Sequence, residues 1–241
     1  MTNLDIAQQA SLQRITHIVD KLGLSEDEFE AYGHYKAKLT SQAIERITNQ
    51  KQGKLILVTA VSPTPTGVGK TTVTVGLAQG LQSIGKHAIP ATREPALGPI
   101  FGVKGGACGG GYSQVLPMED INLFFTGDFP AITSTHNLLS ALLDAHLQFG
   151  NELQIDTRSE LWPRTIDMND RSLRQIVVGL GSGNGVVRED GFVILPASEI
   201  MAILCLSSSL ADLKEHLLDL YHDLSSNAIP CARRHAELEI A

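Results

Sequence analysis

Helical spacing of apolar residues marks the first fifty positions of the chain. Over residues 3–22 the apolar side chains fall near one helical face, and Gly23 suits the position just after a helix. Ser25 and Glu28 have the spacing of a capping box, which predicts a second short helix. A third helix is expected over residues 41–48. Together these segments predict an N-terminal helical arm.

The pattern changes after this arm. Residues 55–58 form a continuous apolar run, which predicts a strand buried on both faces. A loop rich in Pro, Thr and Gly follows, and a helix with regularly spaced apolar residues is expected from Lys70 until Gly85 ends it. Residues 87–91 predict a second short strand. Strand, helix and strand in this order predict a βαβ unit.

A long glycine-rich segment, residues 98–112, comes next. A loop of this length without regular structure is usually functional when it lies inside a compact domain. A second glycine cluster, Gly181-Ser-Gly-Asn-Gly185, superficially resembles the glycine motif of dinucleotide-binding proteins, but no strand is expected before it. We interpret that cluster as a flexible turn.

Helices are also expected over residues 137–146, 170–180, 197–206 and 210–220, with Ser209 and Asp212 spaced as a capping box for the last. The order of elements predicts an α/β fold, with a parallel sheet of the P-loop NTPase type flanked by helices. One nucleotide-binding domain with its helical arm is expected over residues 1–223, followed by a divergent tail over residues 224–241.

Composition narrows the classes of function. Of the 241 residues, 43% are hydrophobic, enough for a sizeable core, and the net charge of −7 argues against a nucleic-acid-binding surface. The longest apolar stretches are too short to span a bilayer, and no secretory signal is evident. Cys108, Cys205 and Cys231 are too widely spaced for a disulfide framework or a zinc motif. We therefore expect a cytoplasmic protein that binds small molecules, without nucleic-acid or membrane partners.

The loop before the helix at Lys70 has the layout of a phosphate-binding loop. Glycines permit a close approach of the backbone to phosphates, the lysine would bridge the β- and γ-phosphates, and the Thr71 hydroxyl would ligate Mg²⁺. Thr64 stands where the usual motif has its first glycine. The alternative is a solvated turn capped by Thr71. The residues expected to bind ATP are Thr64, Pro65, Thr66, Gly67, Val68, Gly69, Lys70 and Thr71.

Arg93 follows the second expected strand, at the edge where open α/β sheets bind ligands. Its planar guanidinium suits a carboxylate or an acyl phosphate. The alternative is a surface ion pair with Glu94 or another acid. Asp128 could hold a cation or orient a ligand, or it could be a turn residue after Gly127.

Three more polar positions have simpler interpretations. Glu199 lies at the start of an apolar helix, where a carboxylate favours the helix dipole. His136 and His146 lack the spacing of metal ligands, so we interpret both as polar packing residues.

Residues 102–112 and 196–205, together with several shorter segments, resemble the formate–tetrahydrofolate ligases. Residues 102–112, Gly-Val-Lys-Gly-Gly-Ala-Cys-Gly-Gly-Gly-Tyr, look like one signature of that family, and residues 196–205 resemble a second. Thr126-Gly-Asp128 and Asp167-Met-Asn-Asp-Arg171 are similar to family segments as well, as are the loop ending at Thr71 and the Arg93-Glu-Pro95 turn. The resemblance extends from about Ile15 to Leu217.

The resemblance implies a reaction in which formate, ATP and tetrahydrofolate give 10-formyltetrahydrofolate, ADP and phosphate through formyl phosphate. It implies catalytic roles for Lys70 and Arg93, and an active-site lining that includes Lys104, Gly105 and Gly106. The alternative for Lys104 is a charged lid that contributes only shape. The family also implies Mg²⁺, activation by a monovalent cation and a homotetramer.

The chain departs from the family in composition and length. The family usually reads His-Phe-Thr-Gly-Asp-x-His around residues 125–130, where this chain has Phe125 and Pro130, and Val68 replaces an acidic residue. Family members are more than twice as long, so we expect a C-terminally truncated member that lacks most of the folate-binding half. The alternatives are an ATP-binding module that cannot formylate folate and a non-catalytic remnant.

Overall fold

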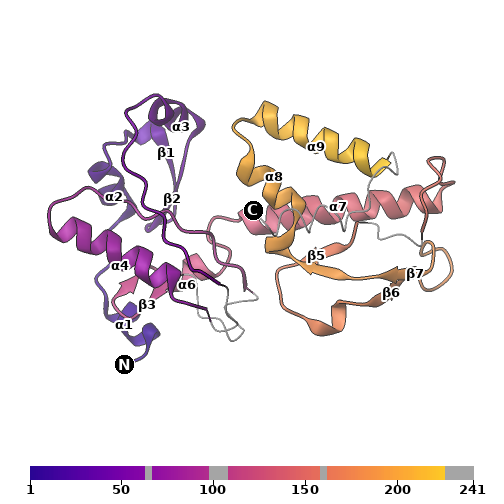
Figure 1. The fold of residues 1–241 in the computed structure, drawn as a ribbon, viewed down its shortest axis with the longest axis horizontal. Helices are drawn as coiled ribbons and strands as arrows, with labels where there is room; N and C mark the ends of the chain where they lie inside the picture. The colour runs from indigo at the N-terminus through magenta and orange to yellow at the C-terminus, as the bar shows by residue number, and fades with distance from the viewer. Residues whose placement is uncertain (63–66, 98–107, 158–161, 226–241) are drawn as a thin grey trace. The chain divides into compact units, whose positions relative to one another are not determined.

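The computed structural model describes residues 1–62, 67–97, 108–157 and 162–225, and it combines helices with short strands (Figure 1). It divides into two compact units, Met1–Asp128 and Phe129–Ala241. The mixture of helices with a small parallel strand pair confirms the α/β character of the chain. Among the described residues, no helix is both long and apolar enough to cross a bilayer.

The first unit begins with two short helices, α1 (Asn3–Gln9) and α2 (Ile15–Lys21), instead of the single expected helical face. The chain leaves the helical conformation at Ala10, where φ is −74° and ψ is 139°. The backbone N–H of Ile15 donates to the carbonyl of His34 at 2.8 Å. This bond between distant residues fixes where α2 begins, which local periodicity could not show.

Ser25 and Glu28 form the predicted capping box, at the start of the 3₁₀ turn η1 (Glu26–Glu28). An unpredicted antiparallel hairpin follows, made of β1 (Phe29–Tyr32) and β2 (Lys36–Leu39), with Phe29 opposite Leu39. The predicted helix over residues 41–48 is confirmed as α3 (Ser41–Thr48). Its N-cap residue, Thr40, accepts a hydrogen bond from the Ala43 N–H.

The two strands predicted around the phosphate loop are wrong. Residues 55–58 and 87–91 have no strand structure, and the side chains of Leu55 and Leu57 are 94% and 80% exposed. An apolar run becomes a buried strand only when neighbouring strands pair with its backbone and other elements cover its faces. Within the described residues of the first unit the strands form only two antiparallel hairpins, and neither includes this run. The expected P-loop sheet is therefore not formed there.

The helix after the loop is confirmed as α4 (Lys70–Ser83). It packs against the small hairpin of β3 (Gly109–Gly110) and β4 (Ser113–Gln114), at the end of the glycine-rich segment (Figure 1). A short helix, α6 (Met118–Asn122), follows this hairpin.

The second unit is built on α7 (Asp128–Gln148), which contains the helix predicted over residues 137–146. β5 (Arg164–Ile166) pairs in parallel with β8 (Phe192–Ile194), and Asn137 of α7 bonds to both backbone groups of Thr165 in β5, at 2.8 and 3.1 Å. The buried core of this unit includes Phe129, Trp162 and Leu195.

The helix predicted over residues 170–180 is wrong. This segment forms the 3₁₀ turn η2 (Arg171–Leu173) and the strand β6 (Ile176–Val178), which pairs antiparallel with β7 (Arg188–Asp190). Asp170 closes the turn by accepting a bond from the Ser172 N–H, and the β-branched run that follows favours a strand once β7 is there to pair with it. The glycine cluster at residues 181–185 forms the turn between these strands, as predicted.

The last two predicted helices are confirmed. After the turn η3 (Leu195–Ala197), α8 (Glu199–Leu206) and α9 (Leu210–Ser225) pack on each other. Asp212 accepts bonds from the N–H and hydroxyl of Ser208, and the Asp212 N–H donates to the Ser209 hydroxyl. The predicted bond from the Asp212 N–H to Ser209 is therefore confirmed, whereas the Asp212 carboxylate accepts from Ser208 in place of the Ser209 N–H that a capping box would use.

Candidate functional site

The described end of the predicted phosphate loop contains two glycines in the left-handed conformation. Gly67 and Gly69 have φ values of 78° and 76°, in the left-handed region that favours glycine. Gly69 is the N-cap of α4, and no heavy atom outside its chain neighbours lies within 4 Å of where its Cβ would be. The predicted ligands Thr64, Pro65 and Thr66 lie outside the described residues.

The beginning of α4 leaves its first amides without a side-chain cap, because its N-cap residue is a glycine. Lys70 and Thr71 are the first two residues of the helix, and the Lys70 side chain is exposed. The first turn of α4 contains no acidic residue, so no carboxylate offsets the positive end of the helix dipole. This arrangement suits an anion with several phosphate groups.

The glycine-rich segment ends beside this helix. A Cβ added at Gly76 of α4 would lie 2.9 Å from the Ser113 hydroxyl, and the Gln79 side chain donates to the Tyr112 carbonyl at 3.2 Å. A Cβ at Gly110 would come within 3.6 Å of the Thr72 hydroxyl, in the first turn of α4. The structure therefore places the described end of this segment next to the start of the phosphate-loop helix. Lys104, Gly105 and Gly106 lie outside the described residues.

The N-terminal helix α1 holds this hairpin from another side. The Gly111 N–H donates to the Asn3 side-chain oxygen at 2.9 Å, and the Gln114 side chain donates to the Asn3 carbonyl at 2.9 Å. The helical arm thus has a structural function that sequence reasoning did not assign to it. Residues separated by more than a hundred positions meet in this contact, so no local signal could have predicted it.

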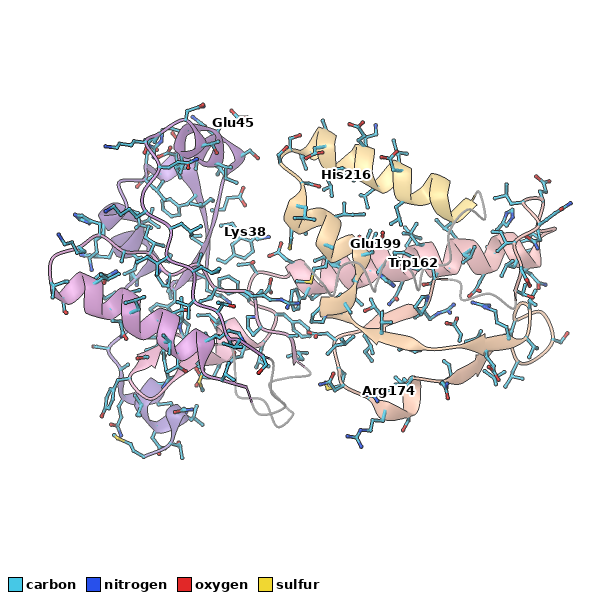
Figure 2. The ribbon with its side chains drawn as sticks, viewed as in Figure 1. Lys38, Glu45, Trp162, Arg174, Glu199 and His216 are labelled. Carbon is cyan, nitrogen blue, oxygen red and sulfur yellow. The ribbon has the colours of Figure 1, made fainter. Side chains whose placement is uncertain are left out.

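Asp128 is a paired carboxylate. It lies 2.7 Å from the Lys38 ammonium, and the Thr126 hydroxyl donates to its second oxygen at 2.6 Å. Burial alone would raise the pKa of Asp128, but the hydrogen bonds from Lys38 and Thr126 and the charge of Lys38 bring that pKa below its ordinary value. Asp128 is therefore ionised at neutral pH. Lys38, on β2 (Figure 2), is a candidate site residue that the sequence analysis missed.

The Arg93-Glu94 turn belongs to the same neighbourhood. The hydrogen bond to Asp128 raises the pKa of Lys38 most, and the charges of Asp128, Tyr32 and Glu94 raise it further against the opposing effect of burial. The Glu94 carboxylate is therefore within electrostatic reach of Lys38. Arg93 is exposed, whereas the next residues along the chain, Pro95 and Ala96, are buried and anchor the turn. The role of Arg93 as a substrate ligand stays a prediction.

The segment that resembles the family's histidine pattern has an unusual backbone. Phe124 and Phe125 both have positive φ, at 64° and 27°, which is uncommon for bulky residues. Counting back from Thr126 in His-Phe-Thr-Gly-Asp-x-His places the first histidine at Phe124 rather than at Phe125. Pro130 lies in the first turn of α7, where the missing N–H costs no intrahelical hydrogen bond.

His136 is a packing residue, as predicted. Its Nε2 lies 2.8 Å from the Pro163 carbonyl and its Nδ1 lies 2.8 Å from the Ser198 hydroxyl. Because a carbonyl only accepts, Nε2 carries the proton, and in the neutral ring Nδ1 accepts from Ser198. The ring also stacks on Trp162, with centroids 4.5 Å apart. Glu199 is the first residue of α8, at the helix start expected for it (Figure 2).

The candidate metal ligand lies at the start of α4. Across the described parts of the chain, no group of three or more His, Cys, Asp or Glu side chains is arranged to hold a metal ion. The Thr71 hydroxyl, at the start of α4, is the group from which a nucleotide-bound Mg²⁺ could take an oxygen ligand.

Comparisons with known proteins agree with the resemblance found in the sequence. The family model described as formate–tetrahydrofolate ligase matches residues 1–235. A formate–tetrahydrofolate ligase of Thermosipho africanus (strain TCF52B) is 60% identical over 217 residues. That match covers 90% of this chain and 39% of the relative, so the chain spans about two fifths of the relative's length.

Proposed function

Because this chain belongs to the formate–tetrahydrofolate ligase family, we propose that it binds Mg-ATP at the loop before α4 and transfers the γ-phosphoryl group to formate. The observation that carries the proposal is the left-handed glycine backbone at Gly67 and Gly69. It leads into an α4 start without a side-chain cap, beside the end of the glycine-rich segment.

The loop supports binding of a triphosphate through its backbone. Backbone N–H groups at a helix start point toward a bound anion, and glycines let the chain approach it closely. Lys70 would place its ammonium between the β- and γ-phosphates, and Thr71 would supply a hydroxyl ligand to Mg²⁺. Thr64, Pro65, Thr66 and Val68 complete the proposed loop, in the P-loop manner that the sequence predicts.

In the proposed reaction an oxygen of formate attacks the γ-phosphorus, the bond to the β–γ bridging oxygen breaks, and ADP leaves. Arg93 would hold the formate carboxylate and then formyl phosphate, because its guanidinium offers two parallel donors. In the family reaction, N10 of tetrahydrofolate then attacks the formyl carbon, phosphate leaves and N10 loses its proton. Lys104, Gly105 and Gly106 are proposed to line this site.

A second candidate function is an ATP-binding module that does not formylate folate. The length comparison supports this second function, because the chain spans 39% of the relative with which it is 60% identical. Neutral replacements at Phe124 and Pro130 point the same way, since each lacks the imidazole of the family pattern.

Isothermal titration with Mg-ATP tests the loop. We expect the Lys70→Ala variant to weaken binding at least tenfold and the Lys86→Ala variant, just beyond the other end of α4, to change it less than twofold. Equal affinity of Lys70→Ala and wild type would refute the loop assignment.

Two turnover assays then separate the candidate functions. ADP release that depends on formate supports phosphoryl transfer, and formation of 10-formyltetrahydrofolate supports the complete reaction. ATP binding without either product would identify the chain as a binding module.

We further propose, from the family, a homotetramer that a monovalent cation activates and that works in the cytoplasm. Light scattering after size-exclusion chromatography measures the mass of the assembly and so tests the homotetramer. Activation by a monovalent cation is tested by comparing turnover in potassium with turnover in tetramethylammonium at equal ionic strength.

A further inference from the structure

Two lysines of the β1–β2 hairpin each form an ion pair with an aspartate. Lys36 and Lys38 alternate along β2 and therefore lie on one side of the hairpin. Lys36 is 3.3 Å from Asp120, and Lys38 is 2.7 Å from Asp128. The two ion pairs thus join the same strand to neighbouring parts of the segment over residues 118–128, and they differ mainly in what surrounds them.

Lys38 has more partners than Lys36. Its ammonium lies 5.7 Å from the centre of the Tyr32 ring, and its carboxylate partner also accepts a bond from the Thr126 hydroxyl. Glu94, beside the proposed formate ligand Arg93, contributes to the electrostatic environment of Lys38. Lys38 therefore holds the turn at residues 126–128 through Asp128, and the Glu94 carboxylate acts on Lys38 through its charge alone.

Stability alone is a weak explanation for this pair. The side chains of Lys38 and Asp128 are 36% and 38% exposed, and ion pairs at such exposure contribute little to folding. The charges matter more for binding, because two carboxylates near an anion site repel an anionic substrate unless a cation offsets them.

We infer that Lys38 is a positioning residue for the proposed reaction. Its ammonium holds Asp128, a predicted substrate-lining residue, in place and offsets the negative charge of Asp128 beside the proposed formate position. The inference rests on the proposed function for its substrate and on the structure for its contacts. It predicts that the loss of Lys38 weakens formate binding and leaves Mg-ATP binding unchanged, because the contacts of Lys38 in the described part of the chain are with Asp128 and Tyr32 and not with residues 67–71.

The experiment compares Lys38→Ala, Lys38→Arg and the matched control Lys36→Ala in the full chain. With formate as the varied substrate, we expect Lys38→Ala to raise the KM for formate at least tenfold and to change the Kd for Mg-ATP less than twofold. Lys38→Arg keeps the charge and should restore most of the affinity. Lys36→Ala should resemble wild type. A formate KM for Lys38→Ala that equals that of Lys36→Ala would overturn the inference.

Hydrogen exchange measured by mass spectrometry gives an independent readout. Lys38→Ala should accelerate exchange in the peptide that covers residues 124–128, and Lys36→Ala, whose lysine pairs with Asp120, should accelerate it less. If the wild-type chain shows no turnover that depends on formate, the proposed function fails, and exchange alone decides the positioning role. Exchange of residues 124–128 that is equally fast in Lys38→Ala and Lys36→Ala would then overturn it.

Discussion

At residue 109 the chain turns back on itself so tightly that only a glycine fits. Gly109 has φ of 92°, and a Cβ there would lie 2.0 Å from the Ser113 carbonyl oxygen. Gly111, two residues later, has φ of 59° but open space around the same position. We therefore expect Gly111→Ala to cost about 1 kcal/mol for its left-handed backbone, and Gly109→Ala to cost about 3 kcal/mol or more because the hairpin must also shift.

Urea unfolding followed by circular dichroism measures the two costs. Equal midpoints for the two variants would show that the hairpin does not pack as described. Both glycines belong to the segment that resembles a family signature, and the structure gives Gly109 a steric reason that its sequence context did not reveal.

The described cysteines should differ in reactivity. Cys108 is buried with its thiol 3.1 Å from the Asn122 side-chain oxygen, and burial together with the charge of Glu119 raises its pKa to about 11. Cys205 is exposed. Because the thiolate is the reactive form, we expect iodoacetamide at pH 8 to modify Cys205 at least tenfold faster than Cys108 in the folded protein. Peptide mapping after timed quenching compares the two rates, and equal rates would contradict the burial of Cys108.

At the scale of elements, one carboxylate joins three pieces of the N-terminal arm. Glu28 of η1 bonds to the N–H and hydroxyl of Ser25 and forms an ion pair with Arg46 of α3. The hydrogen bond from Arg46, then that from the Ser25 amide, lowers the pKa of Glu28 to about 2 from an ordinary 4.5. A lowered folded-state pKa means that the stabilisation is complete above about pH 4.5 and is lost as the pH falls toward 2.

Thermal unfolding from pH 7 to pH 2 checks this prediction. Glu28→Gln should lower the midpoint at pH 7, and the difference from wild type should shrink below pH 4.5. Glu30→Gln, on an exposed position of β1, serves as the control. A difference that stays constant down to pH 2 would show that the Glu28 charge is not what stabilises the arm.

The helices were more predictable than the strands, and the reason is physical. The signals for α3 and α9, a capping residue followed by helical spacing, lie within a few residues of each helix. The apolar run at residues 55–58 and the β-branched run at residues 176–178 each needed a partner strand elsewhere in the chain to decide their structure.

The candidate site follows the same division. The start of a helix at Lys70 after Gly67 and Gly69 could be predicted from the sequence, because the loop and the helix start are local features, and the role of these residues in binding ATP stays a prediction. Lys38 could not be predicted, since its partner Asp128 lies 90 positions away and the hairpin that carries the lysine was itself unpredicted. The alternation of polar residues around Gly33 was the signal that could have indicated this hairpin.

At the scale of the whole molecule, the second unit contains a closed network of four ion pairs. Arg164 and Arg188 each bond to both Asp144 and Asp190, which links α7, β5 and β7. Both Arg188 and Asp190 have side chains that are only 7% exposed. Asp190→Ala would leave the buried Arg188 guanidinium and the half-buried Arg164 guanidinium with a single carboxylate, so we expect a loss of about 3 kcal/mol.

Trp162 makes this loss measurable, because it is the single tryptophan of the chain and lies buried in the same unit (Figure 2). Urea unfolding followed by its fluorescence should give a lower midpoint for Asp190→Ala. Glu189→Ala, an exposed neighbour on β7, should change the free energy of unfolding by less than about 0.5 kcal/mol. Similar midpoints for Asp190→Ala and Glu189→Ala would refute the structural importance of the network.

The exposed run at residues 55–58 has a consequence for the behaviour of the protein in solution. A short, uncharged stretch of Leu, Ile and Val, with Leu55, Ile56 and Leu57 exposed and no partner strand among the described residues, is the kind of sequence that seeds cross-β self-association between identical chains. Lys51 and Lys54 place two positive charges just before it, where they act as gatekeepers through mutual repulsion. High salt screens that repulsion, so the purified chain is best kept dilute and at low ionic strength.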